Sequence, residues 1–361
     1  MPRKFNFGAG PATMPESVLL EVQEELLDWK GLGLSVMEIS HRSPEFIEIA
    51  KQAESDFRDL LSISEDFAVL FTHGGATMQN AMVPLNLAKS DGLASYVNSG
   101  HWAKRSIKEA ERYTNIRIAA SSEDDNFTYF PEQSSWSLDE ESSYVHYTPN
   151  ETIGGLCLRT LDSSPLPIVA DYSSGILSEP IDIEKFSLIY GGAQKNIGPS
   201  GLGFVIVKKE LLGSPQPITP NLLNYTLIHE GESMSNTPPT FAWYVAGKVF
   251  KWLKSIGGVK AIAEINYRKA KKLYDFIDNS DFYSNQINPK NRSIMNVPFL
   301  LLNENLNNVF LEESNEAGLL ALKGHRSVGG MRASIYNGLP EEGVDALLNF
   351  MEAFENKYSN V

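Results

Sequence analysis

The sequence predicts an α/β fold in which a large domain with a mainly parallel sheet is joined to a smaller α+β domain. Between about residues 70 and 210, short apolar runs alternate with helical patterns, which is typical of βαβ units. From about residue 291, this alternation gives way to a few short strand and helix patterns. We therefore expect a large domain over 16–255 and a small domain over 256–361, completed by 1–15.

Composition favours a cytoplasmic protein that binds neither nucleic acid nor membranes. Of 361 residues, 42% are hydrophobic and 21% are charged, and the formal net charge is −14. An acidic chain is a poor partner for nucleic acid or an anionic membrane surface. No apolar run has the length of a signal peptide or a membrane span. The single cysteine, Cys157, excludes an intramolecular disulfide and a CxxC metal site, so we expect no metal.

Two helices are expected before the first strand. One begins at Pro15 and ends near Gly31. The second is amphipathic and runs over about 44–61. Between them, an apolar stretch ends in two neighbouring cations, His41 and Arg42.

The first strand pattern, 67–71, leads through Gly74-Gly75 into a helical pattern. A strand, a Gly-Gly turn and a helix start together present free backbone N–H groups to an anion such as a phosphate. The stretch matches neither of the common phosphate-binding motifs, and any tight turn between a strand and a helix could use glycines here. Phosphate binding at this turn is therefore a hypothesis that needs a second observation.

The remaining elements follow from the same patterns. Further strands are expected at 94–98, 116–119, 144–147, 167–171, 188–190 and 204–207, with a helix at 101–112. Two long helices are expected at 241–255 and 258–279. The small domain is expected to contain strands at 294–297 and 331–335 and helices at 310–317 and 341–355.

Lys195 and Asp171 are the candidate catalytic pair. Lys195 follows a strand pattern in a glycine-rich loop, and Asp171 ends an earlier strand pattern, where an open parallel sheet presents its ligands. Taken alone, such a lysine is most simply a surface residue of a loop. Together with a strand-end acid, it supplies what pyridoxal 5′-phosphate (PLP) requires, an amine for the aldehyde and an anion for the ring nitrogen.

Seven stretches of the chain together resemble the class V aminotransferase family. They are Phe5-Asn-Phe…Gly10-Pro11, Ser35-Val-Met-Glu-Ile-Ser-His-Arg42, Gly74-Gly75, Tyr147-Thr-Pro-Asn-Glu-Thr152, Gly192-Ala-Gln-Lys-Asn-Ile-Gly-Pro199, Asn236-Thr-Pro-Pro-Thr-Phe-Ala-Trp243 and Lys323-Gly-His-Arg…Gly-Gly-Met-Arg-Ala-Ser334. Motifs of this length, in this order, are specific. The resemblance implies the fold type I architecture of PLP-dependent transferases and a homodimer with shared active sites.

The resemblance also implies roles at matching positions. Lys195 would bond to the cofactor aldehyde, Asp171 would pair with the ring nitrogen, and Trp102 would stack on the ring. Thr152 would bind near the ring hydroxyl. The cofactor phosphate would be held by Gly75, Ala76, Thr77 and Gln194, and by Asn236 and Thr237 of the neighbouring subunit. Some members carry an arginine where this chain has Thr77, which leaves one cation fewer near the substrate.

The implied reaction is a ping-pong transamination in which L-glutamate and 3-phosphohydroxypyruvate give 2-oxoglutarate and O-phospho-L-serine, a step of serine biosynthesis. The 4-phosphohydroxythreonine pair of pyridoxine biosynthesis is implied as a second substrate pair. Each of the two main substrates carries an α-carboxylate and a distal anion, and arginine binds both kinds of group bidentately. We expect Arg332 to bind the α-carboxylate. The distal anion would be bound by Arg42 together with His41, His325 and Arg326.

Two alternatives stay open at this point. Another class V enzyme, such as an alanine–glyoxylate-type aminotransferase or a cysteine desulfurase, would share the cofactor residues. A desulfurase needs a nucleophilic cysteine on a mobile loop, whereas Cys157 lies in an apolar stretch where a buried, inert thiol is expected. A non-catalytic phosphate-binding protein of the same fold is the other alternative, and it would show no absorbance from a bound cofactor.

Overall fold

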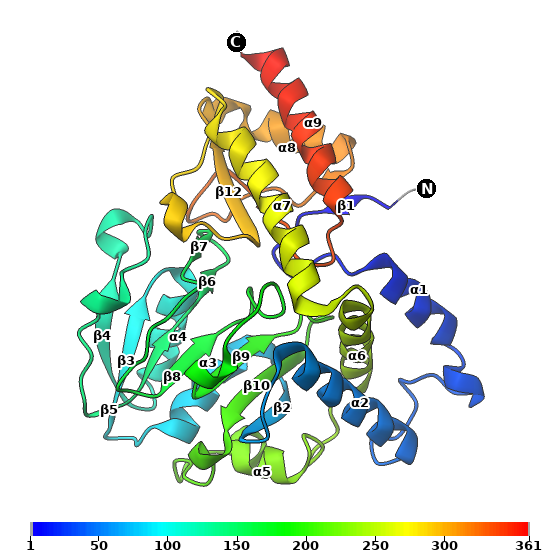
Figure 1. Cartoon of the computed structure of the whole chain (residues 1–361), viewed down its shortest axis with the longest axis vertical. Coiled ribbons are helices and arrows are strands. Elements are labelled where there is room, and N and C mark those ends of the chain that lie inside the picture. The colour runs from blue at the N-terminus through cyan, green and yellow to red at the C-terminus, as the bar shows by residue number, and fades with distance from the viewer. Residues whose placement is uncertain (1–2, 360–361) are drawn as a thin grey trace.

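The computed structural model describes residues 3–359 and shows a seven-stranded sheet in the larger part of the molecule (Figure 1). Its strand order is β2 (Phe67–His73), β10 (Leu202–Lys208), β9 (Leu188–Gly192), β8 (Ile168–Asp171), β5 (Ser142–Tyr147), β3 (Leu93–Asn98) and β4 (Asn115–Ser121). β10 is antiparallel to both of its neighbours, and the other pairs are parallel. The expected mainly parallel sheet is confirmed, and every strand except β10 ends at the same edge.

The sheet separates two hydrophobic cores. Successive side chains along a strand point to opposite faces and therefore enter one core and the other in turn. On β2, Val69 and Phe71 lie in one core, whereas Ala68 and Leu70 lie in the other. Helices α2 (Pro44–Leu61) and α6 (Thr240–Ser255) build the first core, and α3 (Gly75–Leu87), α4 (His101–Ala110) and α5 (Tyr225–Glu230) build the second.

Aromatic side chains join α2 and α6 to the sheet. Phe57 of α2 stacks on Phe250 of α6 with ring centres 4.9 Å apart, and it meets Phe204 of β10 edge-on. Ser43 is the N-cap residue of α2. Its hydroxyl accepts a hydrogen bond from Phe46 N. The helix therefore starts where the sequence predicts.

A second, smaller core lies around a three-stranded sheet of β11 (Tyr283–Ser284), β12 (Asn296–Leu301) and β14 (Met331–Ser334), with α8 (Asn307–Glu316) and α9 (Glu341–Tyr358). β1 (Phe5–Asn6) pairs with β13 (Leu319–Leu320) and brings Phe7 into this core. The long helix α7 (Gly258–Asp278) links the two parts (Figure 1). Val259 and Ile262 belong to the larger core, and Leu273 and Ile277 belong to the smaller one. The domain boundary at 255/256 therefore stays a prediction.

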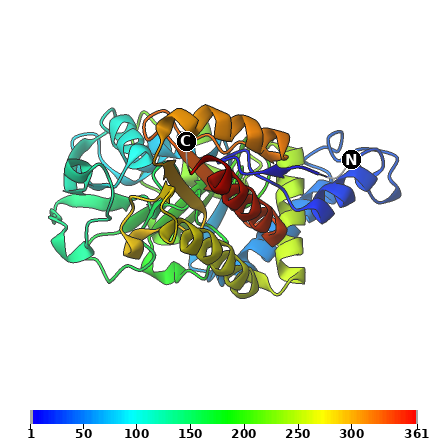
Figure 2. The same cartoon turned by 90° about the horizontal axis from the view of Figure 1, so that it is seen from above.

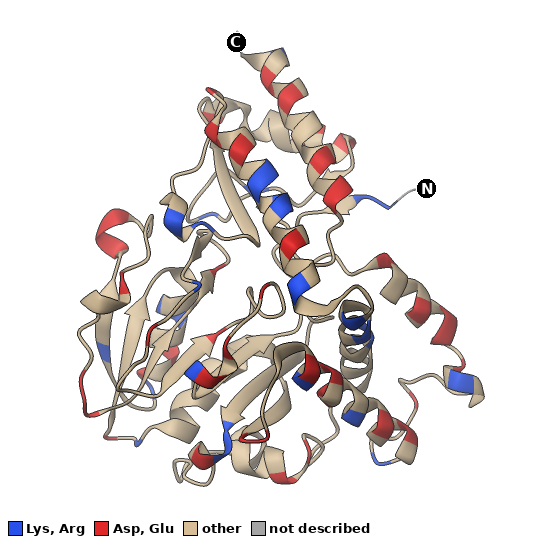
Figure 3. Cartoon of the chain, in the orientation of Figure 1, with Lys and Arg blue, Asp and Glu red and all other residues tan. Residues whose placement is uncertain are grey.

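α1 (Glu16–Glu25) lies at the outside of the molecule near the N-terminal segment (Figure 2). Its charged side chains are all acidic (Figure 3). Large apolar side chains of this helix and of the residues after it are exposed, namely Leu19, Leu20, Leu26, Leu27, Leu32, Leu34 and Met37. Such a concentration of exposed apolar side chains is typical of a surface that contacts another chain.

The sequence patterns place the long helices to within a few residues but do not predict α5. This six-residue helix is capped by Asn224, whose side chain accepts from Thr226 N and Leu227 N. Within residues 3–359, none of the helices combines the length and the apolar character needed to cross a membrane.

Candidate active site

A cavity of about 390 Å³ lies at the edge of the large sheet where the parallel strands end. The loops that follow five strands supply most of its wall: Gly74, Gly75, Ala76 and Thr77 after β2, Trp102 after β3, Thr148, Asn150 and Thr152 after β5, Ser173 and Ser174 after β8, and Gln194 and Lys195 after β9. Gly10, Pro11, Asn80, Asp171, Ser200 and Gly201 complete it. The strand order therefore gathers residues from distant parts of the sequence around one space.

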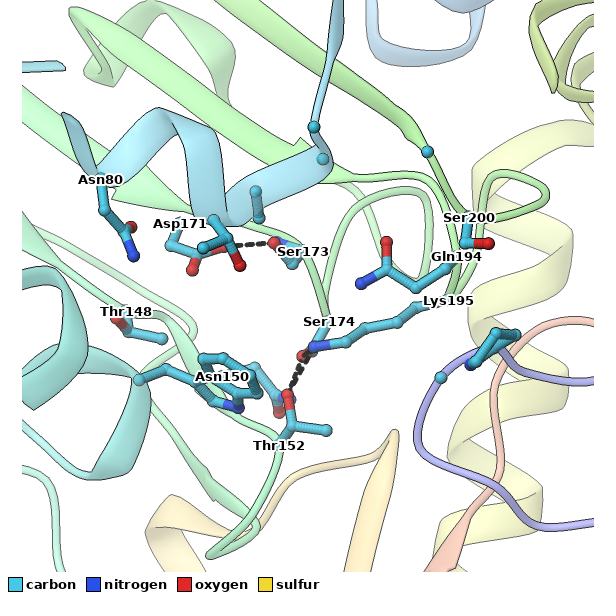
Figure 4. A pocket seen from close by; sticks show the side chains of 18 residues that line it. Asn80, Thr148, Asn150, Thr152, Asp171, Ser173, Ser174, Gln194, Lys195 and Ser200 are labelled. Atoms are coloured by element: carbon cyan, nitrogen blue, oxygen red, sulfur yellow. Dashed lines mark hydrogen bonds between the residues drawn. The ribbon is translucent and has the colours of Figure 1, made fainter. Parts of the chain in front are cut away.

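Lys195 extends into this cavity from the loop after β9 (Figure 4). The residue is 8% exposed. Its Nζ donates hydrogen bonds to Thr152 Oγ1 at 2.6 Å and to Ser174 Oγ at 2.7 Å. Because both partners are neutral hydroxyl groups, they fix the position of the amine without requiring it to be charged.

The environment of Lys195 favours a neutral amine. Burial lowers the pKa of Lys195 from 10.5 to about 8, although the carboxylates of Asp171 and Glu151 oppose this shift. The nearby Arg332 lowers the pKa further. A lysine with such a pKa is partly neutral near physiological pH, and the neutral form is the one that acts as a nucleophile or a base.

Asp171 stands at the end of β8 and is 7% exposed. Its Oδ1 accepts hydrogen bonds from Ser173 N at 2.9 Å and from Ser173 Oγ at 2.5 Å. Burial raises the pKa of Asp171, whereas Lys195 and the two bonds from Ser173 lower it. Ser173 therefore fixes the orientation of a buried carboxyl group that lines the cavity (Figure 4).

The start of α3 opens onto the same cavity. Gly74 and Gly75 have φ of +77° and +59°, a backbone conformation that glycine adopts readily. No side chain among residues 3–359 caps this helix, so N–H groups of its first turn are open to an anion. Gly192 keeps space beside them, since a Cβ there would lie 2.4 Å from Gln194 Oε1 and 3.1 Å from Ala76 N.

Trp102 lines the cavity from the first turn of α4. The centre of its ring lies 5.5 Å from Lys195 Nζ. Trp102 Nε1 and Thr148 Oγ1 are buried and find no hydrogen-bond partner within the described residues 3–359. Such atoms are rare in folded proteins, and their position on this wall suits contact with a bound polar group.

Three of the expected substrate-binding cations come from the smaller part of the molecule. Arg332 Nη1 donates to Thr152 O at 3.4 Å, which places this arginine beside the cavity. Its Nε is buried and lacks a partner among the described residues. The ring of His325 lies 5.2 Å from that of His101 at the start of α4, measured between centres. The neighbouring Arg326 is exposed.

Like His325, Arg326 and Arg332, the other four expected residues do not line the cavity: His41, Arg42, Asn236 and Thr237. His41 and Arg42 directly precede α2, and Arg42 is exposed. Asn236 and Thr237 are exposed in the segment between α5 and α6. In a single chain, the wall of the cavity around Lys195 therefore does not include these four residues.

A family model described as Aminotransferase class-V matches residues 4–347. The chain belongs to the class V aminotransferase family. It is 56% identical over 356 residues to the phosphoserine aminotransferase of Hahella chejuensis (strain KCTC 2396), covering 98% of this chain and 99% of that relative. These comparisons confirm the family that the sequence motifs indicate.

Solved structures agree with this assignment. The phosphoserine aminotransferase of Bacillus circulans subsp. alkalophilus superposes with a TM-score of 0.96 at 41% identity, over 98% of this chain and 99% of that one. The PLP-bound enzyme of Trichomonas vaginalis gives a TM-score of 0.93 at 36% identity, over 97% and 100%. The expected fold of the PLP-dependent transferases is therefore confirmed.

Several cavity residues of this class V aminotransferase are missing from the sequence prediction: Asn80, Thr148, Asn150, Ser173, Ser174 and Ser200. Ser173 and Ser174 lie two and three positions after the strand-end Asp171, so a search for polar residues just after each strand would have found them. Asn80 lies more than one turn inside α3, and no local signal separates it from an ordinary helix residue.

The single thiol of the chain is not a nucleophile on a mobile loop. Cys157 is buried in β7 (Leu156–Cys157), as expected, and burial raises its pKa to about 12. A thiol that stays protonated is unreactive. Metal chemistry has no obvious site either, because residues 3–359 hold no group of three or more His, Cys, Asp or Glu side chains suited to a metal ion.

Proposed function

We propose that the chain is a PLP-dependent aminotransferase that converts 3-phosphohydroxypyruvate and L-glutamate into O-phospho-L-serine and 2-oxoglutarate. The observation that carries the proposal is the buried Lys195 amine, held by two hydroxyl groups in the same cavity as the Asp171 carboxyl group. The names of the curated relatives support the choice of substrate.

The residues of the cavity fit PLP. The aldehyde of the cofactor would bond to the Lys195 amine, and Asp171 would face the ring nitrogen. N–H groups at the start of α3 would hold the phosphate, together with the side chains of Thr77 and Gln194. Trp102 would lie against the ring. The hydroxyl of Thr148, which has no hydrogen-bond partner within residues 3–359, would supply a further polar contact.

PLP supplies an electron sink that allows a proton to leave the α-carbon of a bound amino acid. With PLP bound, the neutral Lys195 amine would accept that proton and later return it to the bound molecule. Thr152 and Ser174 keep the nitrogen of Lys195 in place for both transfers. The Asp171 carboxylate favours a protonated ring nitrogen, because an adjacent anion stabilises the charged form.

Cations around the cavity would select the substrates. Arg332, partly buried beside Thr152, would bind the α-carboxylate that glutamate and 3-phosphohydroxypyruvate share. The distal carboxylate or phosphate would meet His325 and Arg326 of the same chain. Thr77, which stands where some family members carry an arginine, adds no charge to the cavity wall. The 4-phosphohydroxythreonine pair carries a distal phosphate too and would use the same cations.

A homodimer would complete the site. His41, Arg42, Asn236 and Thr237 lie outside the cavity of their own chain, where they would be free to reach the site of a partner subunit. The exposed apolar side chains on and after α1 offer a surface for such a partner. Arg42 and His41 would then add the charge needed by the distal anion, and Asn236 and Thr237 would contact the cofactor phosphate.

The visible spectrum of the PLP-loaded protein tests this proposal. Glutamate alone should shift the absorption band to shorter wavelength and release 2-oxoglutarate. Adding 3-phosphohydroxypyruvate should restore the band, whereas pyruvate and glyoxylate, which lack the distal anion, should restore it far more slowly. Equal rates with the three keto acids would contradict the substrate assignment. A protein that stays colourless with PLP would contradict the enzymatic function itself.

A further inference from the structure

A second buried carboxylate lies next to the site, and so far it enters only through its charge, which opposes the lowering of the pKa of Lys195. Glu151 is 1% exposed. Its Oε1 accepts a hydrogen bond from Ala103 N at 2.8 Å, and its Oε2 accepts one from Trp102 N at 3.0 Å. Both oxygens of the carboxylate are therefore engaged by the first turn of α4.

The start of α4 needs such a partner. The first N–H groups of a helix have no acceptor within the helix, and the residue before α4, Gly100, has no side chain to cap them. Glu151 supplies the missing acceptor from a distant strand. Gly100 permits its approach, because a Cβ at this position would lie 2.6 Å from Glu151 Cδ.

The segment that carries Glu151 also contacts Lys195. β6 (Asn150–Glu151) is followed by Thr152, and Asn150 and Thr152 both line the cavity. Glu151 lies between them, does not line the cavity and instead contacts α4, as expected from the alternation of side chains along a strand. Since Thr152 Oγ1 accepts from Lys195 Nζ, one short segment contacts both Lys195 and the helix turn that carries Trp102.

Several neighbours of Glu151 favour a negative charge on its carboxyl group. Burial raises the pKa of Glu151 to about 7, and the nearby Asp171 adds to this shift. The N–H groups of Ala103 and Trp102 oppose it, as does Lys195, and all three favour the ionised form. An anion at the positive end of α4 is also stabilised by the helix dipole. A buried carboxylate that serves packing alone would be more costly than an apolar side chain of similar size.

We propose that Glu151 is a positioning residue that fixes the start of α4 and thereby holds the Trp102 indole against the ring of the bound cofactor. The proposal relies on the proposed function for the identity of the cofactor. It assigns to Glu151 no contact with PLP or substrate, so its effect on the cofactor is transmitted through Trp102.

The test is the affinity of the apoprotein for PLP, measured by the quenching of tryptophan emission and by near-ultraviolet circular dichroism. Glu151→Gln replaces an acceptor oxygen by an NH₂ group that cannot bond to a backbone N–H. Loss of one charge-assisted bond should weaken PLP binding about tenfold or more. Glu123→Gln is the matched control, because Glu123 contacts α4 through Lys104 at the surface. This control should change the affinity by less than about twofold.

A double-mutant cycle with Trp102→Phe separates positioning from a general loss of stability. If Glu151 acts through Trp102, Glu151→Gln should weaken PLP binding much less in the Trp102→Phe background than in the wild type. If Glu151→Gln fails to fold, Gly100→Ala replaces it in the cycle. This variant keeps the carboxylate but pushes it away from α4, and it should show the same energetic coupling to Trp102→Phe.

Equal losses of affinity in the two backgrounds would overturn the proposal, as would an unchanged affinity of both Glu151→Gln and Gly100→Ala. A wild-type protein that binds no PLP would overturn the proposed function along with it. Normal PLP binding by the wild type with no coupling between Glu151 and Trp102 would overturn the role of Glu151 alone.

Discussion

At the scale of single residues, burial sets the chemistry of the site. Desolvation lowers the pKa of Lys195 and raises that of Asp171, so both groups are closer to their neutral forms than they would be in water. The hydroxyl groups around Lys195 and the bonds from Ser173 to Asp171 then hold the two side chains in place.

The pKa of Lys195 has a consequence that can be measured in the apoprotein. Because burial lowers this pKa from 10.5 to about 8, the reactive neutral amine becomes abundant well below pH 10. The rate of PLP incorporation, followed by absorbance in a pH series, should rise with pH and level off above about pH 8. A rate that keeps climbing to about pH 10 would show an ordinary, solvated lysine instead.

Asp171→Asn tests the proposal that the Asp171 carboxylate faces the ring nitrogen of the cofactor. The amide keeps the shape and can still bond to Ser173, but it cannot stabilise a protonated ring. We expect kcat for transamination to fall ~100-fold or more, as is usual when one electrostatic partner of a transition state is removed. Asp182→Asn, at an exposed loop position, should keep full activity. A near-normal kcat for Asp171→Asn would remove its assigned role.

At the scale of elements, the site lies at the edge of the large sheet where the parallel strands end and the following helices begin. Lys195, Asp171 and Gly74-Gly75 could be found from sequence because each follows an apolar strand pattern, and parallel strands end at one edge. Glu151 could not be found in this way, because its partners belong to a helix start 48 to 49 positions earlier in the chain.

Gly192→Ala tests the expected phosphate site at the start of α3. The new Cβ would lie 2.4 Å from Gln194 Oε1 and 3.1 Å from Ala76 N, so Gln194 would have to move away from the helix start. We expect the affinity of the apoprotein for PLP to fall about tenfold, as measured by titration. Gly154→Ala is the control, since a Cβ there meets nothing within 4 Å among the described residues. Unchanged PLP binding by Gly192→Ala would place the phosphate elsewhere.

At the scale of the whole molecule, α7 joins the two cores and carries a buried lysine. Lys269 Nζ donates to Ile335 O at 3.0 Å, to Tyr336 O at 2.9 Å and to Leu339 O at 3.0 Å. In the same segment, Asn337 N donates to Asn196 Oδ1 at 3.0 Å, directly beside Lys195. The turn after β14, the strand of Arg332, is thereby fixed relative to Lys195.

Lys269→Met should therefore destabilise the protein strongly. The substitution preserves much of the apolar stem but leaves three buried carbonyl groups without their donor, which should lower the free energy of unfolding by ~3 kcal/mol or more. Lys271→Met, at an exposed position on the same helix, should cost less than about 0.5 kcal/mol. The midpoints of urea unfolding of the two variants test this prediction. Similar midpoints would contradict the role given to Lys269.

Shared active sites would allow two inactive variants to complement each other. If Arg42 serves the site of the partner subunit, a hybrid of Lys195→Ala and Arg42→Ala chains has one site with both lesions and one with neither. Random reassortment of equal amounts should then restore about a quarter of the wild-type activity. If Arg42 served its own chain, every hybrid site would carry a lesion, and mixing would restore nothing.

The sequence predicts the family, the mainly parallel sheet and some of the residues that line the cavity, among them Lys195, Asp171 and Trp102, because these depend on local patterns and ordered motifs. It does not predict α5. It also does not predict the contact between His325 and His101, because this contact joins segments more than 200 positions apart. We propose that His41, Arg42, Asn236 and Thr237 act in the site of a second chain, and local patterns do not describe the contact between two chains.

The most direct test of the central claim is to locate the cofactor chemically. Borohydride reduction of the PLP-loaded protein makes the link between PLP and its lysine permanent, and digestion followed by mass spectrometry identifies that lysine. We expect the phosphopyridoxyl group on the peptide that contains Lys195. Its recovery on a different lysine, or on no lysine at all, would contradict the assignment of Lys195 as the catalytic residue.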